Sequence, residues 1–193
     1  MQDLHTTVPW EENIRQMKER VAAHIKSQPG PKWLDGYSGQ SADELLSLAG
    51  KYRTDSLIQA FEQAISRKAE REGTQNLTDE ERIVLAIEAL EREVNNGGYD
   101  QFFANSSKQF APTVVDALVR IGCTKTANIT RNAIKAIGAL DLTEEAIDTA
   151  MSTDNERRQA KFDRSDSSYH KSGESIERQL FAFIKANRSR ISF

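Results

Sequence analysis

The sequence predicts an all-α fold, a compact, bundle-like domain of about seven to nine helices. Apolar residues recur at spacings of three and four along most of the 193-residue chain, which is the period of a helix with one buried face. Residues that favour the beginnings and ends of helices separate these segments. No segment alternates apolar and polar residues with the period of two that a half-buried strand has.

The first helix is predicted over residues 9–28, with a proline in its first turn and a Pro-Gly-Pro sequence directly after it. Turn-forming residues then predict a loop over residues 33–39. We therefore expect an N-terminal helix with its connecting loop in residues 1–39 and a helical domain in residues 40–193. The apolar stripe of the first helix consists of Trp10, Ile14, Met17, Val21 and Ile25.

Two capping boxes mark the starts of later helices. In residues 41–44 and again in residues 78–81, a hydroxyl side chain and a glutamate three positions later can satisfy free amides of a first helical turn. The first box begins a short helix that ends near residue 49, and a separate helix is predicted over residues 54–72. The second box begins the helix with the clearest apolar stripe, which consists of Ile83, Val84, Ile87, Leu90 and Val94.

The helix that begins at Asp79 leads into the most informative stretch, Asn95-Asn96-Gly97-Gly98. Paired glycines favour a backbone turn that other residues adopt with difficulty, so the helix is expected to stop there. Three aromatic residues follow at i, i+3 and i+4, which turns their rings to one side of a short helical segment. The sequence predicts a rigid, polar-lined corner, whose amides either satisfy the carbonyls of a helix end or recognise a partner. The side chains involved are Asn95, Asn96, Tyr99, Asp100, Gln101, Phe102, Phe103 and Asn105.

The C-terminal half predicts three short helices, a linker and a last helix. The helices over residues 112–121 and 129–137 are each followed by glycine, and Thr143 caps the third, which reaches residue 151. The polar run over residues 152–173 is interpreted as a linker. The last helix has an apolar stripe of Ile176, Leu180, Phe183 and Ile184.

The composition favours a helical protein of the cytoplasm. Hydrophobic residues make up 38%, aromatic residues 7% and charged residues 28%. No apolar run approaches the ~18 residues that a membrane span needs, and the acidic N-terminus lacks the basic start of a signal peptide. The single cysteine, Cys123, cannot form an internal disulfide, which suits a reducing compartment, and its thiol is expected to be buried and inert.

The charge is spread unevenly. The net charge is -3, and it divides into -1 for residues 1–75, -5 for residues 76–150 and +3 for residues 151–193. The acidic middle can attract a basic partner. A basic cluster in the last segment alternates with acidic residues, so direct nucleic-acid binding is not expected and a solvated linker is favoured. This cluster consists of Arg157, Arg158, Lys161 and Arg164, with Phe162 and Tyr169 beside it.

No set of catalytic residues is recognisable. None of the three histidines stands three residues after a glutamate, the spacing used by di-iron bundles, so no metal site is expected. The glycine pair lacks the neighbouring lysine of a phosphate loop, and no cofactor is expected. On the predicted helix, Glu81 and Glu88 lie opposite the apolar stripe on a solvated face, where Glu88 pairs with Arg92 four residues later.

The run from Glu93 to Asn105 resembles the signature of the C-terminal domain family of the bacterial DNA-mimic proteins. The similarity extends to residues 117–122 and 177–184, and it covers roughly residues 40–187. The resemblance implies an all-helical, intracellular protein that forms a homodimer. It also implies acidic side chains that stand in for DNA phosphates toward a helix-turn-helix repressor.

These observations lead to two functional hypotheses. The first is a non-enzymatic protein-binding module that engages a basic or DNA-binding protein through the acidic helix face. Its contact residues are expected to be Asp79, Glu80, Glu81, Glu88, Glu91, Tyr99 and Asp100. The alternative is a small-ligand-binding protein or enzyme that uses the polar corner. Its binding residues are expected to be Asn95, Asn96, Gln101 and Asn105.

Overall fold

The structure, a computed structural model, describes residue 10, residues 12–19 and residues 30–193. It divides into two compact units, residues 1–32 and residues 33–193, which are described separately. In the first unit, residues 12–19 are helical, as the apolar spacing predicts. Three side chains of the predicted stripe are exposed: Trp10, Ile14 and Met17. Its other two members, Val21 and Ile25, lie outside the described residues.

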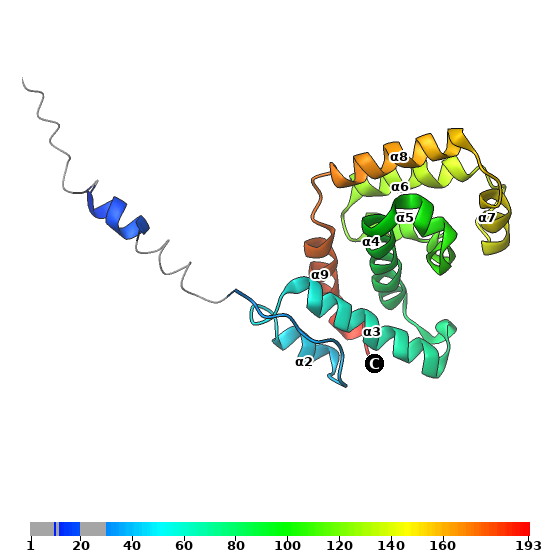
Figure 1. The fold of residues 1–193 in the computed structure, drawn as a ribbon. Helices are drawn as coiled ribbons and strands as arrows, with labels where there is room; N and C mark the ends of the chain where they lie inside the picture. The colour runs from blue at the N-terminus through cyan, green and yellow to red at the C-terminus, as the bar shows by residue number, and fades with distance from the viewer. Residues whose placement is uncertain (1–9, 11, 20–29) are drawn as a thin grey trace, which may run out of the picture. The chain divides into compact units, whose positions relative to one another are not determined.

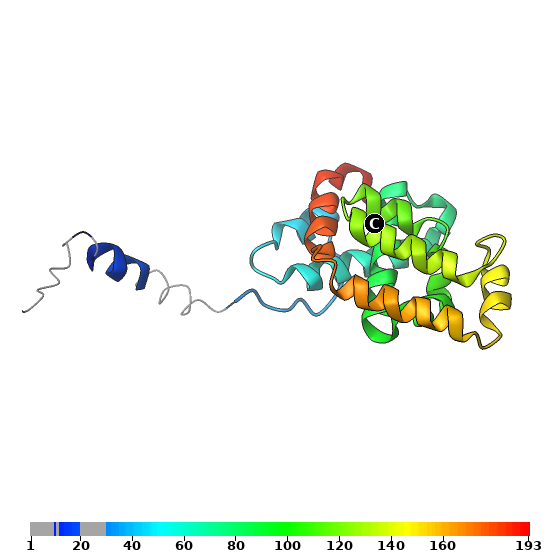
Figure 2. The same cartoon turned by 90° about the horizontal axis from the view of Figure 1, so that it is seen from above.

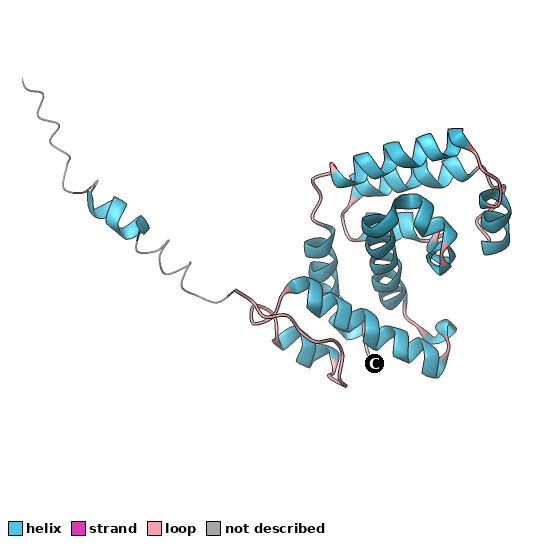
Figure 3. Ribbon diagram, viewed as in Figure 1, coloured by secondary structure: helices cyan, strands magenta, loops and turns pink. Residues whose placement is uncertain are grey.

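The second unit is built from helices, and residues 33–193 contain no β-strand, so the predicted all-α fold is confirmed (Figures 1 and 3). The α-helices are α2 Ala42–Ser47, α3 Thr54–Glu72, α4 Asp79–Ala104, α5 Val114–Arg120, α6 Thr124–Ile137, α7 Glu144–Met151, α8 Glu156–His170 and α9 Ile176–Ala186. Three short 3-10 helices join them: η1 Thr74–Asn76, η2 Ser106–Phe110 and η3 Arg188–Arg190.

Helix α4 is the central element of this unit, and α3, α5, α8 and α9 pack around it (Figures 1 and 2). Its apolar side chains and those of its neighbours form one core. Leu90, Tyr99, Phe102 and Phe103 have no exposed surface. In the described part of the chain, no helix has the length and apolar character that a membrane crossing requires.

Both predicted capping boxes are confirmed. At the start of α2, the Ser41 hydroxyl accepts a hydrogen bond from the Glu44 amide, and the Glu44 carboxylate accepts one from the Ser41 amide. Thr78 and Glu81 make the same exchange at the start of α4. The predicted Thr143 cap of α7 is also present. Local sequence therefore determines where these helices begin.

The boundary between the two units follows Lys32, whereas the sequence suggests one after Gly39. Residues 33–39 attach to α3 through two backbone amides. Leu34 donates to the Ser56 hydroxyl at 3.1 Å, and Tyr37 donates to the Gln63 side-chain carbonyl at 2.8 Å. The loop is therefore part of the helical unit.

The predicted linker over residues 152–173 is wrong, because most of it forms helix α8. Helix α8 contributes only two large apolar side chains to the core. Phe162 and Tyr169 are buried seven residues apart, and the polar Arg158 and Ser165 occupy the other buried positions on the same side. Arg158 is stabilised by donating hydrogen bonds to two backbone carbonyls at the end of α7 and in the following loop. So few apolar residues leave no clear helical period in the sequence.

Candidate functional site

The glycine pair kinks α4 and does not end it. Gly97 and Gly98 have non-helical backbone angles, and Gly98 has φ +77° and ψ -171°, while helical residues continue on both sides. The Tyr99 amide directly after the kink donates to Asp166 Oδ1 of α8 at 2.9 Å. A Cβ atom at Gly98 would overlap the Asp166 carboxylate. The backbone conformation favours glycine here, and the Asp166 side chain of α8 occupies the space that a Cβ atom would take.

The interior of the corner is structural. The Tyr99 ring is fully buried, and its hydroxyl pairs with the Thr130 hydroxyl of α6 at 2.7 Å. Burial raises the pKa of the Tyr99 phenol above its usual range. The sequence-based prediction that Tyr99 contacts a partner is therefore wrong, because the core removes its ring from the surface. Asp100, the next residue, stays partly exposed.

Glu93 stabilises the corner, a role that no pattern in the sequence indicates. Its buried carboxylate accepts hydrogen bonds from Gln101 at 2.7 Å, Asn105 at 2.8 Å and Ser107 at 3.1 Å. Burial opposes the ionisation of Glu93, but these three donors together hold its pKa below the usual value. Two of the predicted ligand-binding side chains, Gln101 and Asn105, thus use their amide groups to organise η2 and the second half of α4.

The acidic residues at the start of α4 also have internal partners, which corrects the predicted solvated face. Glu81 is fully buried and pairs with Lys68 of α3 at 2.8 Å. Glu80 pairs with Arg120 at 3.0 Å and Arg190 at 3.4 Å. The Glu81 side chain therefore cannot contact another protein, and the two arginines neutralise most of the negative charge of Glu80. Asp79 remains exposed beside them.

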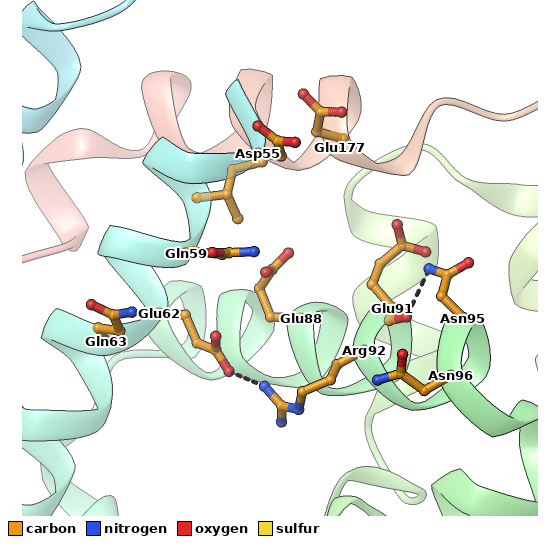
Figure 4. Close-up of a pocket in the computed structure, with 11 residues that line it drawn as sticks. Asp55, Gln59, Glu62, Gln63, Glu88, Glu91, Arg92, Asn95, Asn96 and Glu177 are labelled. Atoms are coloured by element: carbon orange, nitrogen blue, oxygen red, sulfur yellow. Dashed lines mark hydrogen bonds and ion pairs between the residues drawn. The ribbon is translucent and has the colours of Figure 1, made fainter. Parts of the chain in front are cut away.

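Further along α4, Glu88 and Glu91 line a cleft of about 400 Å³ between α3, α4 and α9. We call it the acidic cleft, and Figure 4 shows its side chains. Its five carboxylates are Asp55, Glu62, Glu88, Glu91 and Glu177. The other polar side chains that line it are Gln59, Gln63, Arg92, Asn95 and Asn96. The cleft brings residues from both sequence-based hypotheses to the same surface, Glu88 and Glu91 from the first and Asn95 and Asn96 from the alternative.

Arg92 is the one guanidinium among the residues that line the acidic cleft, and it binds Glu62 of α3 at 2.6 Å (Figure 4). Its second carboxylate neighbour is Glu93 at 3.7 Å. The predicted pair of Arg92 with Glu88 is therefore wrong, because packing of α3 against α4 offers Arg92 a closer partner. Asp55, in the first turn of α3, pairs with Arg53.

The two α4 carboxylates differ in their hydrogen bonding. Glu91 accepts a hydrogen bond from the Tyr169 hydroxyl of α8, whereas Glu88 accepts none from the described residues. Burial, together with the negative charges of Glu62 and Glu91, raises the pKa of Glu88 to about 8. Burial also raises the pKa of Glu91. The protein therefore holds Glu88 largely protonated at neutral pH unless a positive charge enters the cleft.

The arrangement favours a cationic ligand. Carboxylates from three helices face a common space, and guanidinium or ammonium groups donate to carboxylates with charge-assisted hydrogen bonds. Asn95 donates its side-chain amide to the Glu91 backbone carbonyl at 2.7 Å, which leaves the Asn95 side-chain oxygen as a further acceptor. Within the described residues, no three His, Cys, Asp or Glu side chains are grouped so that they could hold a metal ion.

Three of the cleft carboxylates, Asp55, Glu62 and Glu177, do not appear among the sequence-based candidates. They come from α3 and α9, which meet α4 only through tertiary packing. The one signal in the sequence is the polar side of α3, where Asp55, Gln59 and Glu62 stand at i, i+4 and i+7. This spacing indicates that α3 has a polar side, but it does not indicate which helices that side faces. Cys123, by contrast, is buried as predicted, and burial raises the pKa of its thiol to about 11.

Comparison with known proteins adds one match. The model of the family described as DMP19-like protein matches residues 75–187. The matched segment contains the kinked α4 and reaches Glu177, while Asp55 and Glu62 precede it. No curated protein and no solved structure matches the chain.

Proposed function

The chain belongs to the DMP19-like protein family, and we propose that it is a non-enzymatic protein-binding module whose acidic cleft receives basic side chains of a DNA-binding partner. DNA-binding proteins present lysine and arginine to phosphate oxygens. Carboxylates can take the place of those phosphates. The observation that carries the proposal is the composition of the cleft, five carboxylates against one guanidinium.

The charge state of Glu88 supports this kind of ligand. A protonated carboxyl that lies near four other carboxylates ionises when a positive charge approaches, because the charge offsets the repulsion and the desolvation that keep the proton bound. Binding of an arginine or lysine side chain would therefore release a proton from Glu88. An anionic or apolar partner would gain nothing from these residues.

The proposal concerns a local contact and not a copy of an extended duplex. DNA carries one phosphate for about every 1.7 Å of helix axis. A net charge of -3, with 26 basic residues in the chain, cannot match that density over a large surface. The recognised element is therefore a small group of basic side chains that enters the cleft.

The test uses two matched variants. One replaces Glu88, Glu91 and Glu177 with glutamine, and the control replaces three exposed carboxylates outside the cleft, Glu70, Glu144 and Glu145. Proteins of the source organism that the wild-type chain captures are identified, purified and titrated against all three forms. We expect the cleft variant to bind a DNA-binding partner at least about tenfold more weakly, and the control to bind within about twofold of wild type.

Two further results would support or contradict the proposal. Duplex DNA should compete with the protein for the partner, because both occupy the same basic surface, and higher salt should weaken the complex. Equal weakening by both variants would mean that net charge, and not the cleft, governs binding. A partner that binds DNA and this protein at the same time would also contradict it.

In this proposal the protein acts in the cytoplasm, where its one cysteine stays reduced. The homodimer that the family resemblance implies is also part of the proposal. Sedimentation of the purified protein would test the homodimer, and a monomer at all concentrations would remove it from the proposal.

A small cationic ligand is the second candidate, because the cleft volume of about 400 Å³ falls in the range of small-molecule sites. A polyamine would place its ammonium groups between the carboxylates and Asn95 and Asn96. Spermidine at 100 times its dissociation constant would add about 2.7 kcal/mol of stability, which a thermal-shift measurement detects. Absence of a shift with spermidine and agmatine would count against this candidate.

A further inference from the structure

A second charged depression lies on the other side of α4 from α3, between α6 and α8. These two helices run side by side (Figures 1 and 2). The depression has a volume of about 340 Å³, and we call it the basic groove. Its cations come from both helices, Lys135 from α6 and Lys161 and Arg164 from α8. Its lining also includes Ile129, Asn132 and Ser165.

The two helices keep negative charge away from this groove. Helix α6 contains three charged residues, and all of them are basic: Lys125, Arg131 and Lys135. Helix α8 carries acidic residues, but they use its other face. Asp166 accepts a hydrogen bond from the Tyr99 amide of α4, and Asp163 accepts one from Gln159. No carboxylate lines the groove.

The groove cations also lack anionic partners within the described part of the chain. Elsewhere in the second unit, Lys68 pairs with Glu81 and Lys108 pairs with Asp148. Lys135, Lys161 and Arg164 form no salt bridge there. All three are exposed cations that line one groove, and an anion that binds among them would reduce their mutual repulsion.

We propose that the basic groove binds the phosphoryl group of a small phosphorylated ligand. The two ammonium groups and the guanidinium supply charged donors, and the Asn132 side-chain amide supplies a neutral one. The half-buried Ile129 offers an apolar surface for the rest of the ligand. A volume near 340 Å³ lies at the lower end of the range of small-ligand sites, which suits a ligand of this size.

Nucleic acid fits the groove less well. Single-stranded binding relies on exposed aromatic rings that stack on bases. The aromatic residues of α8, Phe162 and Tyr169, are buried in the core, so their rings cannot stack on a base. Duplex binding spreads basic residues along many phosphates, whereas these three cations surround one compact space.

The probe for the test is inorganic pyrophosphate, titrated into the full-length protein by calorimetry at low salt. The groove variant carries Lys135→Gln, Lys161→Gln and Arg164→Gln. Its matched control carries Lys125→Gln, Arg157→Gln and Lys171→Gln, which removes three exposed cations from α6, α8 and the residue after α8. We expect the groove variant to bind pyrophosphate at least about tenfold more weakly than wild type, and the control to change by no more than about twofold.

Circular dichroism verifies that each variant is folded, and the single variant Lys161→Gln gives the same comparison if the triple variant does not fold. Equal weakening in the groove variant and the control would overturn the proposal, as would absence of pyrophosphate binding by the wild-type protein. Tighter binding of a short DNA duplex that displaces pyrophosphate would replace the small ligand with nucleic acid and would also overturn it.

Discussion

Among single residues, Gly98 is the one on which the kink of α4 depends most directly. Its backbone conformation belongs to a region that only glycine adopts readily, and a Cβ atom there would overlap Asp166. We expect Gly98→Ala to lower the free energy of unfolding by about 3 kcal/mol, measured by urea denaturation.

Gly138 provides the control, because it has a similar φ of +75° but a Cβ atom added to it would have no neighbouring atom within 4 Å. Its ψ of 14° places it in the left-handed helical region, so Gly138→Ala should cost only about 1 kcal/mol. Equal losses in the two variants would show that neither the backbone region of Gly98 nor its contact with the Asp166 side chain adds to the cost.

Glu88 gives the acidic cleft a pH dependence. In the unfolded chain this carboxyl titrates near 4.5, and in the folded protein its pKa is about 8. Between these values the folded protein keeps a proton that the unfolded chain has lost, so this contribution to stability is full below about pH 4.5 and disappears as the pH rises through about 8. The wild-type protein therefore becomes less stable across this window.

Glu88→Gln removes that titration. Near pH 8.5 the variant should be more stable than wild type by about 1 kcal/mol, a value well below the full linkage because solvent reaches part of the side chain. Near pH 4.5 the two proteins should unfold at nearly the same urea concentration. Glu70→Gln, on the exposed side of α3, is the control. A stability difference that does not change with pH would show that Glu88 titrates normally.

At the scale of elements, the sequence predicts helix starts better than helix packing. The capping boxes that begin α2 and α4 consist of residues three apart, so the signal and the structure are both local. Helix α8 also begins with a local cap, in which the Asn155 side chain accepts a hydrogen bond from the Arg158 amide, but polar residues fill half of its buried side, so the sequence shows no apolar stripe there. The corner is recognisable from its glycines and amides, but its organiser, Glu93, is not, since an isolated glutamate in a helix gives no sign of burial.

A buried ion pair joins α3 to α4. Lys68 is 2.8 Å from Glu81 and also donates to the Ser192 backbone carbonyl at 2.7 Å. In Lys68→Met the buried Glu81 carboxylate loses its counter-charge, and we expect a loss of about 3 kcal/mol in the free energy of unfolding. Adding Glu81→Gln should recover part of this loss, because glutamine is neutral and still suits the capping box.

Arg71→Ala is the comparison for an exposed pair. Arg71 also lies on α3 and pairs with Glu72, but its side chain is 59% exposed. The substitution should cost no more than about 0.5 kcal/mol. If Lys68→Met lowered the free energy of unfolding by as little, the ion pair with Glu81 would not stabilise the packing of α3 against α4.

At the scale of the whole molecule, the acidic cleft is a product of tertiary structure. Glu88 and Glu91 could be proposed from the sequence because they share one helix with the recognisable corner. Glu62 and Glu177 are 26 and 86 residues from Glu88 and Glu91, respectively, along the chain, and only the packing of α3 and α9 on α4 brings them together. A chain's charge pattern identifies which segment is acidic, but the partners of each carboxylate decide which charges remain free to bind a ligand.

The division into two units leads to the last prediction. Every residue of the described hydrophobic core belongs to the second unit, and so do the side chains of both the acidic cleft and the basic groove. The chain from Trp33 onward retains the loop that binds α3, as well as the contacts of Phe193 with Tyr37 and Phe61. A protein that lacks residues 1–32 should therefore unfold with a free energy within about 0.5 kcal/mol of the full chain and with the same denaturant dependence. A loss above about 2 kcal/mol would mean that the first unit contributes to the folding of the second, and the core would then extend beyond residues 33–193.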